Sequence, residues 1–466
     1  MNRAENKRFS GRERPTPAIG QRARQLLQIA ALSFVCTLAP FISLAQAQAE
    51  PVDTYQESHG LSGQYGYVLI DASTGKVLAD HNADRSFIPA SLAKIPTTLI
   101  ALDTLGPKHR FETRLLAEGR IDGGVLYGSL HLVGSGDPTL KTRNLERMAD
   151  VLAQKGITHV SDDFTFNTDA LPRSAVIDKD QPAGHGYNPA VSGLNVDLNL
   201  WRSNGVARKL TAPGYHAARL FHSAASRRGI MLPLPKRHIG KVPGQPIARH
   251  RSAPVSQIVE SMMEHSTNLT AEALGALSVD AMGSSPTSLA DAAKLTTDWI
   301  KNQSGSIDGK GWEDFSLANH SGLSSQSRAT PRQIASILRL GHQRFGEKFR
   351  ALHAEHSTSG FQAFEMRGKI GAMRFVRGYG GFLSIGGRDL IFAIMANDMK
   401  QRARADAGIK GLQSEAWMAQ ALERELAILG DWIADYWPTG QETSVKPERS
   451  TQPILNSYIP KPKPTR

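Results

Sequence analysis

Ser91-Leu92-Ala93-Lys94 places a hydroxyl and an amine three residues apart, at the start of a segment with helical apolar spacing. In a helix such side chains are neighbours, with ~5–6 Å between their Cβ atoms. Serine is a weak nucleophile at its ordinary pKa, and a partly desolvated lysine can lose its proton near neutrality and act as its base. The helix N-terminus would also stabilise an oxyanion beside Ser91. The motif therefore predicts a serine nucleophile activated by Lys94.

The Ser-x-x-Lys pattern is not specific by itself. Ser73-Thr74-Gly75-Lys76 matches it too, in a predicted hairpin turn where neither side chain is held. A Ser and a Lys at this spacing are more often an ordinary polar helix start, so further motifs must decide.

Two further motifs favour catalysis. Ser266-Thr267-Asn268 interrupts a helical segment, and Lys369-Ile370-Gly371 opens a predicted strand. A second hydroxyl to relay protons, an amide to hold a substrate carbonyl and Lys94, and a lysine to counter negative charge would complete a serine acyl-transfer site. Taken one at a time, Ser266, Asn268 and Lys369 could be a helix cap, an Asn cap and a lysine at a sheet edge. Their occurrence together, in this order along the chain, indicates one site.

Strands and helices in a simple order position these motifs. Residues 65–81 predict two strands joined by a turn at 72–75, and residues 375–398 predict two strands joined by the primed turn Gly386-Gly387. Helices are expected at 89–106, 254–283 with a polar interruption at 264–268, 288–303 and 411–429. Pairing the first two strands with the last two gives one antiparallel sheet flanked by helices. Short segments with strand-like patterns begin near residue 111 and include one helix at 144–155, which predicts an inserted unit.

Composition and the chain ends set further limits. A chain of 466 residues with 40% hydrophobic and 21% charged residues is long enough for two domains. Residues 1–49 predict a signal peptide with an Ala-x-Ala site before Glu50, the alternative being an uncleaved membrane anchor. The single cysteine, Cys36, lies inside it, which excludes disulfides, a cysteine nucleophile and a thiolate metal site from the exported product. Residues 438–466 are Pro-rich and predicted to be disordered.

The charge is unevenly distributed. The formal net charge is +12, and the run from Leu198 to Val259 contains many Lys and Arg residues but no Asp or Glu. Such a run could bind an anionic polymer. An exported protein with few aromatic residues disfavours nucleic acid, so anionic cell-envelope material is the expected partner. A solvated basic face without a partner is the alternative.

The chain resembles a known family in these motifs and their surroundings. "FIPASLAK", "GDPTL", "YNPAVSGLNVDLNL", "HSTNLTAEAL" and "SGLS" look like segments of the class C low-molecular-mass penicillin-binding proteins, the D-alanyl-D-alanine carboxypeptidase/endopeptidase family. The likeness covers about residues 63–426. It implies an α/β (α+β) fold with a penicillin-binding-protein transpeptidase-like core, an antiparallel sheet flanked by helices, and an inserted β-rich domain. The expected divisions are a signal peptide at 1–49, a catalytic domain at 50–110 and 251–437, an inserted domain with the basic stretch at 111–250, and a tail at 438–466.

The resemblance also implies catalytic roles. Ser91 would be the acylated nucleophile, Lys94 its general base and Ser266 the proton relay. Asn268 would hold a substrate carbonyl, and Lys369 would support the relay and the substrate carboxylate. No metal and no cofactor are expected.

Substrate binding is expected along the strand that follows Lys369. The implied oxyanion hole is the backbone N–H of Ser91 and of Ala372, with Gly371 beside them. The family's threonine is Ile370 here, which removes a hydroxyl that normally holds the terminal carboxylate. Strand alternation places Ile370, Ala372 and Arg374 on one face, so Arg374 is predicted to supply part of that recognition. A second departure is His320, before Ser-Gly-Leu-Ser, for which a loop position and no catalytic role are expected.

The implied function is a periplasmic serine-type carboxypeptidase or endopeptidase. It would cleave D-alanyl bonds in peptidoglycan stem peptides or cross-links through an acyl-enzyme, bind β-lactam antibiotics as inhibitors, and keep no stable membrane span after signal cleavage. One alternative is a peptidoglycan-binding pseudoenzyme in which Ile370 has weakened catalysis. Another is a lactamase or esterase on the same scaffold.

Overall fold

The computed structural model describes residues 61–182, 185–203, 206–303, 312–356 and 364–437. The predicted signal peptide at 1–49 and the tail at 438–466 lie outside the described residues. Across the residues that are described, no helix combines the length and apolarity needed to cross a membrane.

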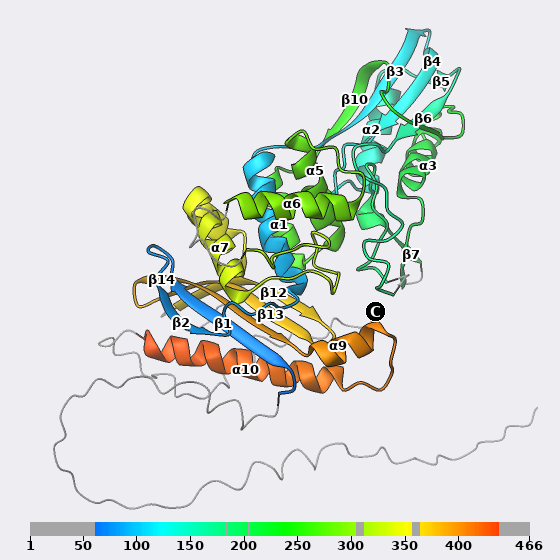
Figure 1. The fold of residues 1–466 in the computed structure, drawn as a ribbon. Helices are drawn as coiled ribbons and strands as arrows, with labels where there is room; N and C mark the ends of the chain where they lie inside the picture. The colour runs from blue at the N-terminus through cyan, green and yellow to red at the C-terminus, as the bar shows by residue number, and fades with distance from the viewer. Residues whose placement is uncertain (1–60, 183–184, 204–205, 304–311, 357–363, 438–466) are drawn as a thin grey trace, which may run out of the picture. The chain divides into compact units, whose positions relative to one another are not determined.

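A six-stranded antiparallel sheet forms the centre of the fold (Figure 1). Its spatial order is β11 (Ala354–Glu355), β12 (Phe364–Met373), β13 (Val376–Ile385), β14 (Arg388–Asn397), β1 (Gln64–Asp71) and β2 (Val77–His81). The pairing of β1 with β14, which joins Gln64 to Asn397, closes the first strands onto the last. Gly386 and Gly387 both have positive φ, as a primed hairpin turn requires. The predicted pairing and the Gly-Gly hairpin are confirmed.

Alternation along β1 explains the layers on the two faces of this sheet. Val68 and Ile70 belong to a core shared with α1 and α7, whereas Tyr67 and Leu69 belong to a core shared with α10. Figure 1 shows α10 on one face and α1 and α7 on the other. The helical elements of this part are η2 (Ala90–Ala93), α1 (Lys94–Thr104), α4 (Val255–His265), α5 (Asn268–Ala281), α6 (Leu289–Gln303), α7 (Pro331–Phe345), α8 (Glu347–Ala351), α9 (Met399–Asp406) and α10 (Ser414–Asp435).

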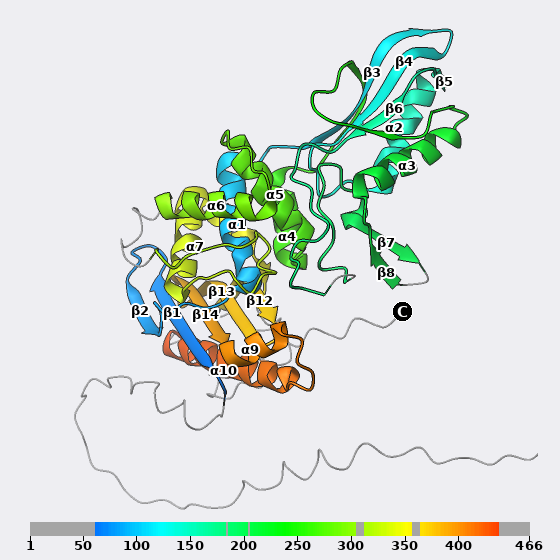
Figure 2. The same ribbon diagram turned by 45° about the vertical axis from the view of Figure 1, so that its right-hand side comes forward.

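A second sheet is built from residues between Phe111 and Arg251 (Figure 2). Its order is β10 (Gln245–Arg251), β3 (Glu112–Asp122), β4 (Val125–Val133), β6 (Phe164–Asn167) and β9 (Lys236–His238), with β5 (His159–Val160) beside β4. It shares a buried core with α2 (Thr142–Gln154) and α3 (Pro213–Ser226). Two short elements complete this part, η3 (Asp197–Asn199) and the hairpin of β7 (Leu200–Ser203) and β8 (Val206–Lys209). This agrees with an inserted β-rich domain, and we keep 111–250 as its proposed limits.

The segment between β6 and η3 divides its packing: Leu194 and Val196 join the core of the second sheet, whereas other residues do not. Leu171, Ile177 and Val191 share a buried cluster with Ile100 of α1 and Leu269 of α5. Part of the insertion therefore packs against α1 and α5, the helices that begin at Lys94 and Asn268.

The basic run is partly neutralised inside the fold. Six of its cations pair with acidic residues from other parts of the chain: Arg227 with Glu146, Arg228 with Asp150, Lys236 with Asp163, Arg237 with Asp169, and both Arg249 and Arg251 with Glu112. These pairs weaken the positive field expected from the sequence. The pairs agree with the alternative of a solvated basic face, and binding of an anionic polymer stays a prediction.

Candidate active site

Ser91 lies in a 3₁₀ turn that leads directly into α1. The turn spans Ala90–Ala93, and helix α1 begins at Lys94. Pro96 lies in the first turn of this helix. A proline there removes an N–H that has no partner within the helix, so no kink is needed. Leu92 and Ile95 are fully buried on either side and fix the turn against the sheet. Ser91 stays half-buried at the surface of this core.

The amine of Lys94 has three acceptors around it. Nζ lies 3.0 Å from Ser91 Oγ, 2.8 Å from Asn268 Oδ1 and 2.7 Å from the carbonyl oxygen of Ser321. Burial lowers the pKa of Lys94 well below its ordinary value, the charge of Lys369 lowers it further, and Glu272 opposes both. A neutral amine keeps two N–H donors for Asn268 and Ser321, so its lone pair can accept the Ser91 proton. The geometry suits a general base.

The break between α4 and α5 delivers the second motif. Ser266 adopts a left-handed conformation with φ of 54°, and α5 begins at Asn268. Ser266 Oγ lies 3.1 Å from Ser91 Oγ. The Oδ1 atom of Asn268 accepts the hydrogen bond from Lys94, and its Nδ2 donates a hydrogen bond to the carbonyl oxygen of Tyr187 at 2.8 Å. A non-glycine residue held in this region is strained, and such residues cluster at functional sites.

Strand β12 runs beside the serine turn and brings the third motif. A Cβ atom at Gly371 would lie 2.7 Å from the carbonyl oxygen of Pro89 and 3.1 Å from the nitrogen of Ser91, so only glycine allows this approach. Lys369 is 5% exposed, and its Nζ donates to the carbonyl of Ile370 at 3.0 Å. Burial lowers the pKa of Lys369 to about 8.

The prediction for the residues after Gly371 is wrong in one respect. Strand β12 ends at Met373, so Arg374 lies exposed in the turn to β13 and does not continue the alternation of Ile370 and Ala372. Phe375, with φ of 60°, completes this turn. Ile370 is half-buried and packs against the core shared with α10, which accounts for an apolar side chain here.

A cleft of about 720 Å³ collects these residues. Its lining includes Ser91, Ser266, Asn268, Ala372 and Arg374. The insertion contributes Asp180, Gln181, Pro182 and Tyr187, and α9 contributes Arg402, Ala405 and Asp406. The cleft thus has the catalytic motifs on one side and the insertion on another.

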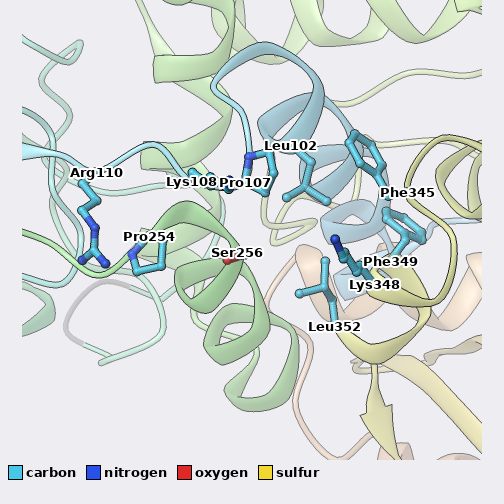
Figure 3. Close-up of a pocket in the computed structure, with 10 residues that line it drawn as sticks. All are labelled: Leu102, Pro107, Lys108, Arg110, Pro254, Ser256, Phe345, Lys348, Phe349 and Leu352. Atoms are coloured by element: carbon cyan, nitrogen blue, oxygen red, sulfur yellow. The ribbon is translucent and has the colours of Figure 1, made fainter.

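A further cavity of about 570 Å³ lies at the end of α1, beside α4, α7 and α8 (Figure 3). Leu102, Phe345, Phe349 and Leu352 form its apolar part, and Lys108, Arg110 and Lys348 line it as well. None of the candidate catalytic residues lines it. The cleft at Ser91 is therefore the candidate active site.

Sequence reasoning missed the buried residue Glu272, and it expected no catalytic role for His320, which lies beside it. Glu272 and His320 are both 0% exposed, and the backbone N–H groups of His320 and Ser321 donate to the Glu272 carboxylate. Glu272 follows Asn268 by four residues and so shares its face of α5, a spacing that could have signalled it. His320 lies in a loop as expected, but nothing near it in sequence predicts Glu272 as its neighbour.

Comparison with known proteins agrees with the motifs. A model of the D-Ala-D-Ala carboxypeptidase 3 (S13) family matches residues 48–209 and 202–416. A D-alanyl-D-alanine carboxypeptidase of Actinomadura sp. is 32% identical over 169 residues, which is 35% of this chain and 31% of that relative's length. A carboxypeptidase of Mycobacterium tuberculosis is 25% identical over 370 residues, and the match covers 72% of this chain and 77% of that relative's length.

The fold also has a solved counterpart. Penicillin-binding protein 4 of Haemophilus influenzae superposes with a TM-score of 0.67 at 18% identity, covering 81% of this chain and 99% of its own. The penicillin-binding-protein fold inferred from the sequence is thereby confirmed. With a family model that matches most of the length, the chain belongs to the D-Ala-D-Ala carboxypeptidase 3 (S13) family.

Proposed function

We propose that the protein is a serine-type D-alanyl-D-alanine carboxypeptidase or endopeptidase acting on peptidoglycan stem peptides or cross-links. Family membership and the names of its relatives support the reaction class. The observation that carries the proposal is the contact of Ser91 Oγ with both Lys94 Nζ and Ser266 Oγ. Export to the periplasm by a cleaved signal peptide is part of the proposal, because the substrate lies outside the cytoplasm.

Acylation begins at the hydroxyl of Ser91. Neutral Lys94 accepts its proton, and Oγ attacks the carbonyl carbon of the penultimate D-alanine. The oxyanion lies at the backbone N–H groups of Ser91 and Ala372. The proton passes through Ser266 to the leaving amine as the C–N bond breaks, which leaves an ester on Ser91.

Deacylation reverses these roles with water as the nucleophile. The ester carbonyl is attacked by water, whose proton is taken up by the same Lys94 and Ser266 pair. The C–O bond to Ser91 breaks, and the proton returns to Oγ. The products are the shortened peptide acid and the free enzyme.

Substrate recognition uses groups on both sides of the cleft. The Asn268 amide donates one hydrogen to Tyr187, so its second N–H is available for a substrate carbonyl. Lys369 and Arg374 are the proposed partners of the substrate's negative charge, since Ile370 has no hydroxyl to offer.

Fluorescent penicillin tests the proposal. It should label the unmutated protein covalently and fail to label Ser91→Ala. The chain supplies a matched control in Ser73→Ala, because Ser73 belongs to the other Ser-x-x-Lys sequence, in an exposed turn where it donates to Asp71. That variant should be labelled normally, and absence of label on the unmutated protein would refute the proposal.

Defined peptides separate the possible activities. Pentapeptide and cross-linked muropeptides are incubated with the purified protein and the products are identified by mass. Release of D-alanine or of uncross-linked peptides supports the peptidase. Peptidoglycan binding without products would indicate the pseudoenzyme, and rapid turnover of penicillin would indicate a lactamase.

A further inference from the structure

Glu272 links helix α5 to the loop that contacts Lys94. Its carboxylate accepts the backbone N–H of His320 at 3.1 Å and of Ser321 at 2.8 Å. The carbonyl of Ser321 then accepts Lys94 Nζ at 2.7 Å. Glu272 therefore fixes the peptide that supplies one of the three partners of the lysine amine.

The side chain of His320 fills the space between α5 and α6. Its Nε2 lies 2.9 Å from Thr296 Oγ1 of α6, and its Nδ1 lies 3.4 Å from Glu272 Oε2 of α5. Its carbonyl oxygen accepts Thr97 Oγ1 of α1 at 3.0 Å. His320 thus contacts α1, which begins at Lys94, and also α5 and α6.

Gly275 provides the room for this ring. A Cβ atom at position 275 would lie 2.0 Å from His320 Cδ2, far closer than any real contact. Glycine is unfavourable inside a helix, so its presence in α5 needs a reason, and the His320 ring supplies one. The His320 ring occupies the space that a side chain at position 275 would need.

Charged groups act on Lys94 from two neighbouring elements. Two of them act on Lys94 directly: Lys369 of β12 is positive and Glu272 of α5 is negative. His320, from the loop at 319–322, lies beside Glu272. Burial alone would raise the pKa of Glu272, but its interactions with His320 and Ser321 outweigh burial and hold it below its ordinary value. Glu272 is therefore a buried anion close to the amine, and His320 is the side chain beside it.

We propose that His320 and Glu272 are positioning residues for Lys94. Glu272 holds the Ser321 carbonyl on the amine, and His320 offsets the negative charge that Glu272 presents to it. The Lys94 amine then gives up its proton more readily than it would beside Glu272 alone. This inference rests on the proposed function, in which Lys94 is the base for Ser91.

The first test measures the proton affinity of Lys94 without any substrate. Protein labelled with ¹³C-lysine is titrated by NMR, and the Lys94 signal is assigned by its loss in Lys94→Arg. In His320→Ala the midpoint should move up by about half to one pH unit, because Glu272 is no longer offset. An unchanged or lower midpoint would overturn the proposal, whether or not the protein reacts with penicillin.

The second test follows acylation by penicillin across pH. In His320→Ala the acidic limb should move to higher pH by the same shift, with the rate recovering at alkaline pH. His320→Asn keeps a donor near Glu272 and should restore part of the unmutated profile. A loss of rate that is equal at every pH would indicate only structural damage and contradict the proposal.

Gly275→Ala gives an independent approach, because it displaces the ring without changing it. The single variant should shift the profile as His320→Ala does, and Gly275→Ala added to His320→Ala should cause no further shift. Additive shifts would show that the two positions act separately. If His320→Ala does not fold, the titration of Gly275→Ala and of Thr296→Val, which removes the Nε2 partner, decides the question. Absence of penicillin label on the unmutated protein would refute the peptidase, whereas the NMR midpoint decides this inference.

Discussion

Gly371 lies against the backbone of Ser91, so closely that a methyl group at 371 would come within 3.1 Å of the Ser91 nitrogen. Gly371→Ala must therefore push β12 away from the serine turn and separate the two proposed oxyanion donors, the N–H groups of Ser91 and Ala372. We expect the penicillin acylation rate to fall roughly 100-fold, the loss typical of a missing oxyanion donor.

The control for this variant is Gly430→Ala in α10, where an added Cβ would meet nothing within 4 Å. It should acylate normally and melt at the same or a slightly higher temperature, because alanine is the better helix former. Normal acylation by Gly371→Ala would show that the close approach has no part in the chemistry.

Lys94→Met should separate catalysis from folding. Methionine fills most of the lysine volume and carries no proton acceptor of comparable strength, so we expect acylation to fall roughly 10²–10⁴-fold. The melting temperature should change by less than about 4 °C, since no buried amine remains to be desolvated. A variant that loses activity only by unfolding, as seen by circular dichroism, would contradict the role of base.

The pKa of Lys369 predicts an alkaline limit for substrate binding. Its amine is charged below about pH 8 and neutral above it. Attraction to a terminal carboxylate is therefore present at pH 7 and lost as the pH rises through 8, so KM should rise. A peptide ending in an amide is the control, because it has no carboxylate to lose, and an equal rise of both KM values would refute the assignment.

The lowered pKa of Lys369 also affects folding stability. Its contribution to stability rises with pH, whereas its attraction to the substrate falls. The unfolded chain, with Lys369 near its ordinary pKa of 10.5, binds more protons than the folded chain between about pH 8 and 10.5. The contribution of Lys369 to folding stability should thus increase with pH across this window. Denaturant unfolding of the unmutated protein and of Lys369→Met, compared at pH 7.5 and 10, measures it.

Arg374 remains our proposed partner for substrate charge despite its position in the turn. Arg374→Ala should raise KM for peptide substrates about tenfold with little change in kcat, the loss expected for one charged hydrogen bond at a surface. Arg388→Ala is the control, because Arg388 stands at the other hairpin of the same sheet, over Tyr436. If Ile370→Thr raises turnover while Arg374→Ala has no effect, compensation by Arg374 is wrong.

The sequence predicted what depends on local pattern and order. The β1–β14 pairing follows from two groups of strands at the ends of the chain, and the helix break at Ser266 follows from its polar interruption. Helix α7 was not predicted, although Thr330 caps it and Pro331 stands in its first turn. That omission could have been avoided, because a cap followed by proline is a standard start signal.

Other features depend on contacts that no local pattern contains. Alternation cannot show that β12 stops at Met373, because the stop is set by the turn at Arg374 and Phe375. The Glu272–His320 neighbourhood joins residues 48 positions apart. The ion pairs of the basic run likewise use acids from outside the run, so the composition of the run alone could not show which of its charges are paired.

The hydrogen bond from Asn268 to Tyr187 joins a catalytic motif to a residue between β6 and η3. Leu171, Ile177 and Val191 of that stretch also pack on α1 and α5. The insertion is therefore not structurally independent of the rest of the fold. Excising residues 111–250 would remove Asp180, Gln181, Pro182 and Tyr187 from the lining of the cleft and take away the acceptor of the Asn268 amide.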